Sequence, residues 1–522
     1  MGNVRSTADE AEENGGGRAS VGEASDGAPQ EATASAVAAS FGNMTIASVQ
    51  KAPRDTIIDT TKEFHIAPMM GVTFREFRYF VRLLSKRAVL WTEMVVDDTI
   101  LHSDNLDYHL GYDTDVEPPI ICQIGGNQAG KAAAVTREVT QNYGYTEINL
   151  NAGCPSHRVA SKRAFGAALL QDLSVAIAML QSMNEGVRES GANVSIKLRI
   201  GVDDDDDWEW TRQTVAHLSK VCKRFYVHAR KVLTKGLDPA QNRRIPPLHY
   251  PRVYALCREF PDCEFWINGG IMSIDQARDV CFGIVHSAVG DDNSTSTAPE
   301  DVYSGLIPPG HGALPCPTCC QSNGSCVTPP IQATAPPNLR GCLIGRAVMD
   351  DPINLLATLD TDFYGASDNP AHSRRQVLCE YAEYLTRLYP RRCGDCFETH
   401  AQITTRPPGV DPVANYHCPL CKQGIDERPA SHLGQPLPQL IHRHIIGRAF
   451  KPVQGAFCGL AGIAKPWRRF LQQAMNDKEH VNCGPGYLLL WAVRQLEQGQ
   501  CTAQPVTAAL DELFPSKINN RR

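Results

Sequence analysis

The sequence predicts a (β/α)8 TIM barrel, an α/β fold, followed by a smaller carboxyl-terminal α-helical domain. Eight short apolar runs, each ending in a polar or glycine residue, alternate with segments of helical length and period, such as 73–84 and 173–183. Alternation of this kind predicts a parallel sheet, and eight repeats predict a closed barrel. The expected strands are 64–67, 89–93, 119–123, 146–151, 194–199, 224–230, 263–268 and 341–346.

The other segments flank the barrel or interrupt it. The amino-terminal segment is rich in Ala, Gly, Ser and Glu without periodicity, which predicts a disordered acidic extension. A long Pro-, Ser- and Gly-rich segment before the last strand predicts an insert, and a cysteine-rich segment interrupts the helical domain. We therefore divide the 522 residues into an extension (1–55), the barrel (56–365, with an insert over 290–338), the helical domain (366–500, with helices at 374–389 and 438–450 and a cysteine-rich insert over 391–434) and a tail (501–522).

A cysteine follows the fourth expected strand directly. In such barrels the chemistry lies at the carboxyl ends of the strands, where the loops converge. Cys154 stands there between Gly153 and Pro155, two residues that restrict its turn. We therefore take Cys154 as the candidate reactive side chain.

Polar residues at other strand ends suit a phosphorylated heterocycle. The Asn-Gly-Gly at 268–270 and the Gly-Arg at 345–346 follow strands seven and eight, where barrels often bind phosphate through backbone N–H groups and a cation. Gln123 can hydrogen-bond in both directions to a heterocyclic edge, and Lys197 would place positive charge beside an electron-rich ring. This combination suits flavin mononucleotide (FMN).

The motifs at these strand ends resemble, in their order, those of the flavin-dependent tRNA-dihydrouridine synthases, particularly the DusA-type branch. The resemblance runs from about 64 to 352 with one interruption and resumes in the helical domain. The motifs are Ala67-Pro-Met-Met-Gly-Val-Thr, Trp91-Thr-Glu-Met, Gln123-Ile-Gly-Gly, Glu147-Ile-Asn-Leu-Asn-Ala-Gly-Cys-Pro-Ser, Phe165-Gly-Ala, Ile196-Lys-Leu-Arg-Ile-Gly, Val227-His-Ala-Arg-Lys, Asn242-Arg-Arg-Ile-Pro-Pro-Leu, Ile267-Asn-Gly-Gly-Ile, Ile344-Gly-Arg, His442-Arg-His-Ile-Ile-Gly and Trp467-Arg-Arg-Phe.

The resemblance implies reduction of the C5=C6 bond of tRNA D-loop uridines, at positions 20 and 20a, with electrons passing from NADPH through FMN. Cys154 would give a proton to C5 after hydride reaches C6, because a cysteine is mostly thiol at neutral pH. The implied flavin contacts are Pro68, Met69, Met70, Gln123, Lys197, His228, Asn268, Gly269, Gly270, Gly345 and Arg346. The implied tRNA contacts are Asn151, Arg243, Lys465 and Arg468, whereas Ala240 departs from the lysine that the branch tends to have there.

The charge distribution agrees with an RNA substrate. The net charge is −6, but residues 1–50 hold seven acidic and two basic side chains, or −5, so the remainder carries only −6 − (−5) = −1. Residues 436–475 contain six Lys or Arg and no acid, and in the light of the resemblance we expect them to form an RNA-facing surface rather than an ordinary solvated helix face.

Cysteine usage and hydropathy point to an intracellular protein. The 19 cysteines are scattered through expected strands and helices, as free thiols are in a reducing compartment. We find no apolar run long enough to span a bilayer, and the acidic extension argues against an organellar transit peptide. We expect a cytoplasmic monomer without stable membrane insertion. Gly2 fits the N-myristoylation pattern, although one acyl chain beside an acidic segment binds membranes only marginally.

Two pairs of cysteines in the third insert have metal-ligand spacing. Cys393 and Cys396 form one Cys-x-x-Cys pair, Cys418 and Cys421 form another, and 21 residues separate the pairs. Such pairs suit tetrahedral zinc, and the alternative is a set of free thiols in a variable loop. A weaker candidate set is Cys316, Cys319, Cys320 and Cys326. The five aspartates at 203–207 are expected to form an exposed loop, because consecutive carboxylates point in different directions and make poor metal cages.

Two other functions remain open at this point. One is an FMN barrel oxidoreductase that acts on a free small molecule such as a pyrimidine, which would have no use for a basic helical domain. The other is a catalytically silent tRNA-binding protein, against which the complete flavin set and Cys154 argue.

Overall fold

The computed structural model describes residues 61–155, 165–282, 335–389, 439–476, 484–498 and 506–514, all within one compact unit, Ile58–Arg522. Its eight strands are parallel and neighbour one another in the order β1-β8-β7-β6-β5-β4-β3-β2. A single bridge between His65 and Val89 joins β1 to β2 and closes the ring. The strands are β1 (Glu63–Ile66), β2 (Leu90–Val96), β3 (Ile120–Gly125), β4 (Glu147–Ala152), β5 (Asn193–Arg199), β6 (Arg224–His228), β7 (Glu264–Asn268) and β8 (Leu339–Ile344).

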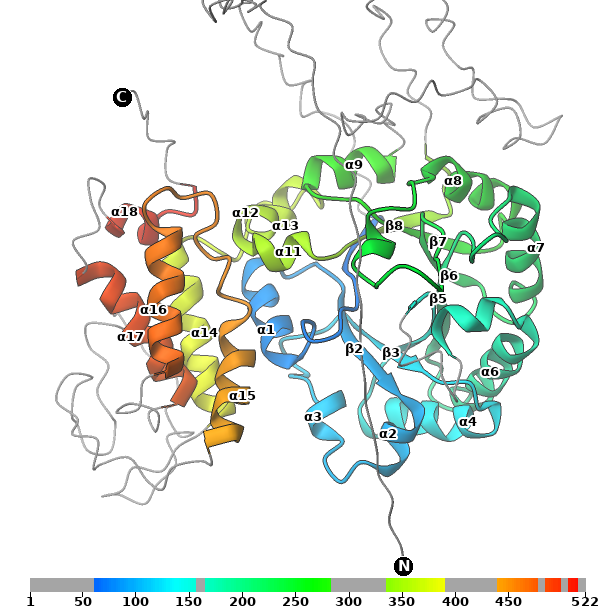
Figure 1. The fold of residues 1–522 in the computed structure, drawn as a ribbon, viewed down its shortest axis with the longest axis horizontal. Coiled ribbons are helices and arrows are strands. Elements are labelled where there is room, and N and C mark those ends of the chain that lie inside the picture. Colours follow the sequence, from blue (N-terminus) through cyan, green and yellow to red (C-terminus); the bar gives the residue numbers. More distant parts are fainter. Residues whose placement is uncertain are drawn as a thin grey trace, which may run out of the picture. The chain divides into compact units, whose positions relative to one another are not determined.

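Helices surround this sheet, and the TIM barrel is confirmed (Figure 1). Each predicted strand is present, with boundaries that differ by at most a few residues. Local capping helps to set the helix starts: Asp207 accepts a hydrogen bond from the backbone N–H of Trp210, and Asp172 accepts one from Ser174. The barrel helices are α1 (Arg75–Leu84), α2 (Asp97–His102), α3 (Asp107–Leu110), α4 (Ala129–Arg137), α6 (Leu173–Gly186), α7 (Trp208–Leu218), α8 (Tyr250–Glu259) and α9 (Ile274–Phe282), with α11 (Ala347–Asp350), α12 (Pro352–Leu356) and α13 (Leu359–Asp362) after β8.

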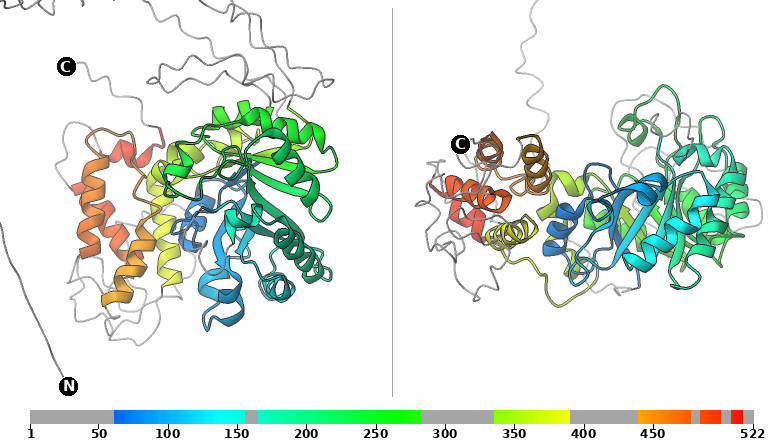
Figure 2. Two further views of the ribbon diagram at one scale, coloured as in Figure 1. Left: turned by 45° about the vertical axis from the view of Figure 1, so that its right-hand side comes forward. Right: turned by 90° about the horizontal axis from the view of Figure 1, so that it is seen from below.

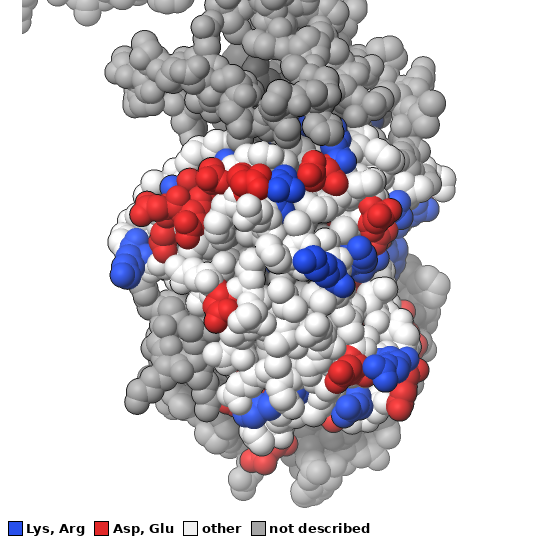
Figure 3. All heavy atoms as spheres, turned by 90° about the vertical axis from the view of Figure 1, so that its right-hand side faces the viewer, with Lys and Arg blue, Asp and Glu red and all other residues white. Residues whose placement is uncertain are grey.

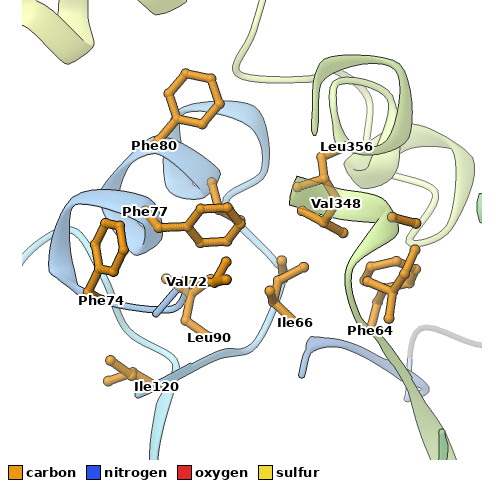
Figure 4. Close-up of a cluster of buried hydrophobic side chains, with 14 of the residues drawn as sticks. Phe64, Ile66, Val72, Phe74, Phe77, Phe80, Leu90, Ile120, Val348 and Leu356 are labelled. Carbon is orange, nitrogen blue, oxygen red and sulfur yellow. The ribbon is translucent and has the colours of Figure 1, made fainter. Parts of the chain in front are cut away.

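The core lies on both faces of the strands because successive side chains point to opposite sides. On the outer face, Phe74, Phe77 and Phe80 at the start and along α1 lie against Ile66 and Leu90 of the neighbouring strands (Figure 4). A separate buried cluster on the alternate strand positions fills the barrel interior. It consists of Ala67, Val89, Trp91, Ile121, Tyr226, Trp266 and Leu343.

The polar atoms of the interior cluster have partners. The indole N–H of Trp91 donates to Nδ1 of His65 over 3.1 Å, and that of Trp266 donates to Glu63 over 2.8 Å. Tyr226 donates to Glu147 over 2.8 Å. Burying a polar group costs free energy unless the group is hydrogen-bonded, so these contacts stabilise the aromatic cluster in the barrel interior. The carboxyl ends of the strands remain available for chemistry.

A group of helices beyond the barrel stands beside α1 (Figures 1 and 2). Its helices are α14 (Arg374–Leu388), α15 (Gln439–Phe450), α16 (Ala464–Asn476), α17 (Gly484–Gln498) and α18 (Val506–Asp511). Ser373 caps α14 through the backbone N–H of Gln376, and Trp467 of α16 is fully buried in this helical domain. The carboxyl-terminal helical domain is thus present, and its helices α14 and α15 were predicted within two residues at each end.

The helical domain continues further along the chain than the sequence indicated. Helix α18 falls inside the segment that we assigned to a tail, and it buries Val506, Ala509 and Leu510. The guanidinium of Arg374 donates to the carbonyl of Glu512 over 2.8 Å, which ties this helix back to the start of α14. The short length of α18 and the polar residues around it concealed its apolar face from the sequence analysis.

Several predicted features lie outside the described residues. These are the amino-terminal extension with Gly2, the insert up to 334, the cysteine-rich insert and the chain after 514. Both cysteine sets proposed as metal ligands belong to them. Across the described ranges, none of the helices combines the length and the apolar character that crossing a bilayer requires.

Candidate active site

The candidate residues from the strands meet at the carboxyl end of the barrel. Asn151 of β4 lies opposite Lys197 of β5, and His228 of β6 lies opposite Asn268 of β7. Gln123 of β3 is opposite Asn149 of β4. The barrel register therefore brings together residues that are up to 145 positions apart in the sequence, as we predicted from their places at strand ends.

A ladder of side-chain amides crosses three neighbouring strands. Asn151 donates from Nδ2 to Oε1 of Gln123 over 2.9 Å, and Gln123 donates from Nε2 to Oδ1 of Asn149 over 2.9 Å. Asn149 donates in turn to Oγ of Ser195 over 2.9 Å. Gln123 is buried and held in one orientation, and each end of its amide retains capacity for one more hydrogen bond. Sequence reasoning missed Asn149, although its position two residues before Asn151 places it on the same face of β4.

The turn that carries Cys154 is held from three sides. Oδ1 of Asn151 accepts hydrogen bonds from the backbone N–H groups of both Gly153 and Cys154, each over 3.1 Å. Nε of Arg199 donates to the carbonyl of Gly153 over 3.1 Å, and the carbonyl of Cys154 accepts from Ala167 over 3.0 Å. The thiol is half-buried. These contacts fix the backbone that presents the candidate proton donor.

Arg199 joins this turn to the loop after β6. Its Nη1 donates to the carbonyls of Lys231 and Asn242, each over 3.0 Å. The sequence analysis gave Arg199 no role, because its motif position did not show which way the guanidinium would point. In the structure, Arg199 connects the backbone beside Cys154 to the segment that presents Arg243.

Positive charge is concentrated around the site. Burial and, secondarily, the charge of Arg199 lower the pKa of Lys197 to about 7, while attraction to Cys154 acts in the opposite sense. Burial also lowers the pKa of Arg199 to about 10. The pKa of His228 falls well below its ordinary value because of burial and then the charges of Arg199 and Lys197. A neutral imidazole among cations is the arrangement expected where a protein receives an anionic ligand.

Two observations test whether a flavin nucleotide fits these residues. Nε2 of His228 and Nε of Arg243 are buried, and neither has a hydrogen-bond partner among the described residues. Gly269 and Gly270 have φ values of +116° and +69°, and a Cβ at Gly270 would lie 2.4 Å from a methyl carbon of Leu248. A phosphorylated planar ligand needs hydrogen-bond donors and backbone that is not covered by side chains. The unpartnered nitrogen atoms and the two glycines supply both, so these residues fit FMN.

The remaining flavin candidates lie in loops at the same end of the barrel. Pro68 and Met69 are half-buried between β1 and α1, and Met70 is 63% exposed. Gly345 follows β8, and Arg346 after it is exposed. Two further exposed apolar side chains, Ile245 and Met272, occur in the loops after β6 and β7 and were not singled out from the sequence. A large apolar residue in a strand-end loop was the signal that could have identified them.

The four tRNA candidates fall into two groups. Asn151 belongs to the amide ladder, and Arg243 is half-buried in a short helical turn, Gln241–Arg243, close enough for its charge to act on Cys154 and Arg346. Lys465 and Arg468 are exposed on α16 of the helical domain. The structure thus brings Asn151 and Arg243 to the reactive centre and places the other two on a different domain.

The basic stretch at 436–475 is only partly a free surface, which corrects our prediction. Arg448 forms an ion pair of 2.8 Å with the fully buried Glu76 of α1, and Lys451 donates to the carbonyl of Gly71. Both cations therefore contact the barrel. A sequence shows that a helix is basic, but it does not show which cations face a neighbouring domain. On the side of the barrel that carries α7, acidic side chains gather along the upper part of the face, and basic side chains lie beside and below them (Figure 3).

No group of three or more His, Cys, Asp or Glu side chains among the described residues is arranged to hold a metal ion. The aspartates at 203–207 instead organise their own loop. The carboxylate of Asp203 accepts from the backbone and hydroxyl of Thr234, each over 2.7 Å, and Asp206 pairs with Lys231 over 2.8 Å. This agrees with a loop rather than a cation site.

Comparisons with known proteins agree with this arrangement. The family model for dihydrouridine synthase (Dus) matches residues 65–288, a range that holds Cys154 and the candidate residues from β1 to β7. Among similar proteins, the tRNA-dihydrouridine(20/20a) synthase of Shigella flexneri is 41% identical over 228 residues, which cover 43% of this chain and 65% of the relative. The synthase of the same name from Escherichia coli K12 is also 41% identical over 228 residues, covering 43% of this chain and 64% of the relative.

That of Shewanella oneidensis is 41% identical over 218 residues, covering 42% of this chain and 63% of the relative. The matches thus span slightly less than two thirds of these relatives. A solved carboxyl transferase domain of Rhizobium etli pyruvate carboxylase covers 85% of this chain and 61% of its own, at 10% identity and a TM-score of 0.26, too low to support an argument. The ordered motifs, the eight-stranded parallel barrel and the family match agree with one another: residues 65–288 of this chain are similar to the dihydrouridine synthase family.

Proposed function

We propose that this protein is a tRNA-dihydrouridine synthase that uses NADPH and FMN to reduce the C5=C6 bond of D-loop uridines at positions 20 and 20a. The observation that carries the proposal is the fixed turn of Cys154 beside Lys197 and Arg199 at the mouth of a dihydrouridine synthase barrel. The relatives with known names are synthases for positions 20 and 20a, which supports the same substrate here.

Residues of this chain would bind the flavin as follows. Within the described part of the chain, His228 and Arg243 each offer a buried nitrogen without a partner. Lys197 offers a cation, and Gln123 offers one donor and one acceptor. A Cβ at Gly345 would meet nothing within 4 Å, so the backbone after β8 is open to a phosphorylated ligand. When bound, the reduced flavin supplies the hydride equivalent for C6 of the uracil ring.

Cys154 would complete the reduction as a general acid. Its thiol proton goes to C5 of uracil as the C5=C6 bond is reduced, and the sulfur is left as a thiolate that solvent reprotonates. Lys197 and Arg199 lie close enough for attraction to a Cys154 thiolate, which raises the pKa of both cations against the effect of burial.

The helical domain would bind the tRNA. Lys465 and Arg468 are exposed on α16, and Arg243 presents a further cation at the barrel mouth. The target uridine has to leave its stack to reach a buried flavin, at a cost of a few kcal/mol that contacts elsewhere on the tRNA must offset. We further propose that the protein acts as a monomer in the cytoplasm.

Reconstitution with purified components tests the proposal. The protein, FMN, NADPH and an unmodified tRNA transcript should yield dihydrouridine at position 20 or 20a, read by mass spectrometry of nuclease fragments. Free uridine and uracil serve as parallel substrates. Reduction of a free pyrimidine but not of tRNA would overturn the tRNA assignment, and a protein that binds tRNA but leaves it unmodified would overturn the enzymatic one.

A further inference from the structure

The loop between β1 and α1 carries three proposed flavin contacts, Pro68, Met69 and Met70. Its ends are closed by hydrogen bonds within the loop. The backbone N–H of Met69 donates to Oγ1 of Thr73 over 3.0 Å, and the backbone N–H of Thr73 donates to the carbonyl of Met69 over 3.0 Å. These bonds close the turn around Met69 but leave the peptide groups at its tip without partners inside the loop.

The tip of this loop, Gly71, is bonded to two other parts of the protein. Its backbone N–H donates to the carboxylate of Glu93 on β2, and its carbonyl accepts from Nζ of Lys451. Gly71 has a φ of +68°, a conformation that glycine adopts without strain. Lys451 lies directly after α15, so the helical domain supplies one of the two contacts that hold the tip of a barrel loop.

The backbone of Lys451 is itself held close to the barrel. Arg448, three residues earlier, pairs with Glu76 of α1 over 2.8 Å, and its guanidinium carbon lies 4.7 Å from the centroid of the Phe74 ring. Glu76 is fully buried and also accepts a hydrogen bond from Tyr389. Because a buried charge is strongly destabilising without its partner, this pair keeps the end of α15 in place. Lys451 is therefore presented to Gly71 by a fixed segment.

We propose that Lys451 is a positioning residue for the flavin site: by holding the carbonyl of Gly71, it fixes the loop that presents Met69 and Met70. The inference rests on the proposed function, because it takes these two residues as flavin contacts. Docking of the helical domain then completes the cofactor site as well as providing a surface for tRNA. The chemical contact is local, one ammonium group on one peptide carbonyl, and it can be removed without changing the flavin-facing side chains.

The test compares three variants with the wild-type protein. Lys451→Met removes the donor but keeps the length of the side chain, and Lys451→Arg restores a donor. Lys220→Met is the matched control, because Lys220 is exposed after α7 in a loop that leads into β6, at the opposite end of the barrel from Gly71. A thermal melt of each variant without cofactor checks that all four proteins fold.

Three readouts then follow: the FMN dissociation constant from quenching of FMN fluorescence, the amide hydrogen exchange of a peptide that covers 68–73, and the KM for tRNA. Lys451→Met should raise the FMN dissociation constant about tenfold, which is the effect of losing roughly 1.4 kcal/mol of binding free energy. It should also speed exchange in 68–73. Lys451→Arg should recover most of both effects, and Lys220→Met should match the wild type.

The outcomes separate this inference from the proposed function. A wild-type protein that does not bind FMN would overturn the proposed function. Equal FMN binding and equal exchange in wild type and Lys451→Met would overturn the role of Lys451 alone. A raised KM for tRNA with unchanged FMN binding and exchange would also overturn it, because Lys451 would then act on the RNA phosphates directly.

Discussion

Asn151 donates a hydrogen bond of 2.9 Å to Gln123, and through the other atom of the same amide it accepts the backbone N–H of Cys154. One side chain therefore sets the orientation of the amide proposed to bind the flavin edge and the turn proposed to carry the proton donor. In the proposed reaction, Asn151 therefore helps to fix the separation between the flavin, which would deliver the hydride, and Cys154, which would deliver the proton. A residue that was expected only to touch tRNA thus has a structural role at the reactive centre.

We expect Cys154→Ala to separate binding from chemistry. The substitution removes one sulfur atom and leaves the backbone contacts of the turn intact, so FMN and tRNA should bind as before. Reduction of the flavin by NADPH should continue because it needs no proton donor at C5. Dihydrouridine formation should fall by about 10²-fold to 10⁴-fold, the usual contribution of a positioned general acid. Single-turnover assays with pre-reduced enzyme provide the measurement, and a near wild-type rate would exclude Cys154 as the acid.

Changes at Asn151 should affect the turn and the amide ladder to different degrees. Asn151→Asp keeps an oxygen that can accept from Gly153 and Cys154 but loses the donor to Gln123, whereas Asn151→Ala loses both functions. We expect Asn151→Ala to cost more in kcat and to change the rate at which a thiol reagent alkylates Cys154. The Asp variant should show the alkylation rate of the wild type. If both variants react alike, Oδ1 of Asn151 does not order the turn.

Lys197 should make the stability of the cofactor-free protein depend on pH. Its pKa is lowered from an ordinary 10.5 to about 7 in the folded protein, chiefly by burial. Below pH 7 the lysine is charged in both the folded and the unfolded protein, so burial of its charge lowers the free energy of unfolding. Between about pH 7 and 10.5 the unfolded chain binds more protons, so this contribution to stability rises with pH.

The measurement is the difference in thermal midpoint between wild type and Lys197→Met across this range. The variant should be the more stable at pH 6 to 7, and the difference should shrink as the pH approaches 10. The affinity for FMN should change with pH in the opposite direction, because the anionic groups of FMN favour the charged lysine. The affinity of the wild type should fall above pH 7, and the affinity of Lys197→Met should not depend on pH in this way. A pH-independent difference in midpoint would mean that Lys197 keeps its charge throughout.

Loss of one partner from the buried pair of Glu76 and Arg448 should lower the free energy of unfolding by more than loss of an ordinary surface ion pair. Arg448→Met would leave the buried carboxylate of Glu76 with Tyr389 as its remaining partner among the described residues, and we expect a loss of about 3 to 5 kcal/mol in the free energy of unfolding. Urea unfolding measures it. The double variant Glu76→Leu with Arg448→Met removes both charges and should recover part of the loss. No recovery would show that packing around Arg448 matters more than its charge.

Zinc is a separate proposal, for residues that lie outside the described part of the chain. If Cys393, Cys396, Cys418 and Cys421 form a tetrahedral site, protein purified without chelators should contain one zinc per chain. Cys418→Ser should abolish that zinc, whereas Cys316→Ser should not. Chelation should leave the FMN content unchanged, because the proposed flavin contacts in the barrel do not include any of these cysteines. Zinc-free protein by elemental analysis would rule out this site.

Much of the barrel could be predicted because its physical rules act locally. Strands buried on both faces must be apolar, and each βα loop must begin with a residue that ends the strand, so the eight strands and Cys154 were visible in the sequence. Contacts across strands were less visible. Asn149 became part of the site only when the register placed it opposite Gln123.

The contacts between the barrel and the helical domain could not be predicted from the sequence, for a different reason. Arg448 and Lys451 looked like two more cations of an RNA surface, because their partners, Glu76 and Gly71, are more than 370 residues away in the sequence. Nothing in the local pattern of α15 distinguishes a cation that faces solvent from one that faces a buried carboxylate. Helix α18 is only six residues long, too short to be stable by itself, and its packing against the helical domain makes it a stable element.

The closure of the barrel is uneven. The backbone pairing at the β1–β2 junction is limited to the single bridge between His65 and Val89, whereas every other neighbouring pair of described strands is joined through at least three residue pairs. Helix α1, which connects these two strands, is the helix on which Arg448 and Tyr389 fasten the helical domain. The helical domain is therefore attached to the helix that connects the two strands with the least backbone pairing. A substitution that loosens Arg448 or Tyr389 from α1 would therefore act beside the place where the fewest backbone pairings hold the ring together.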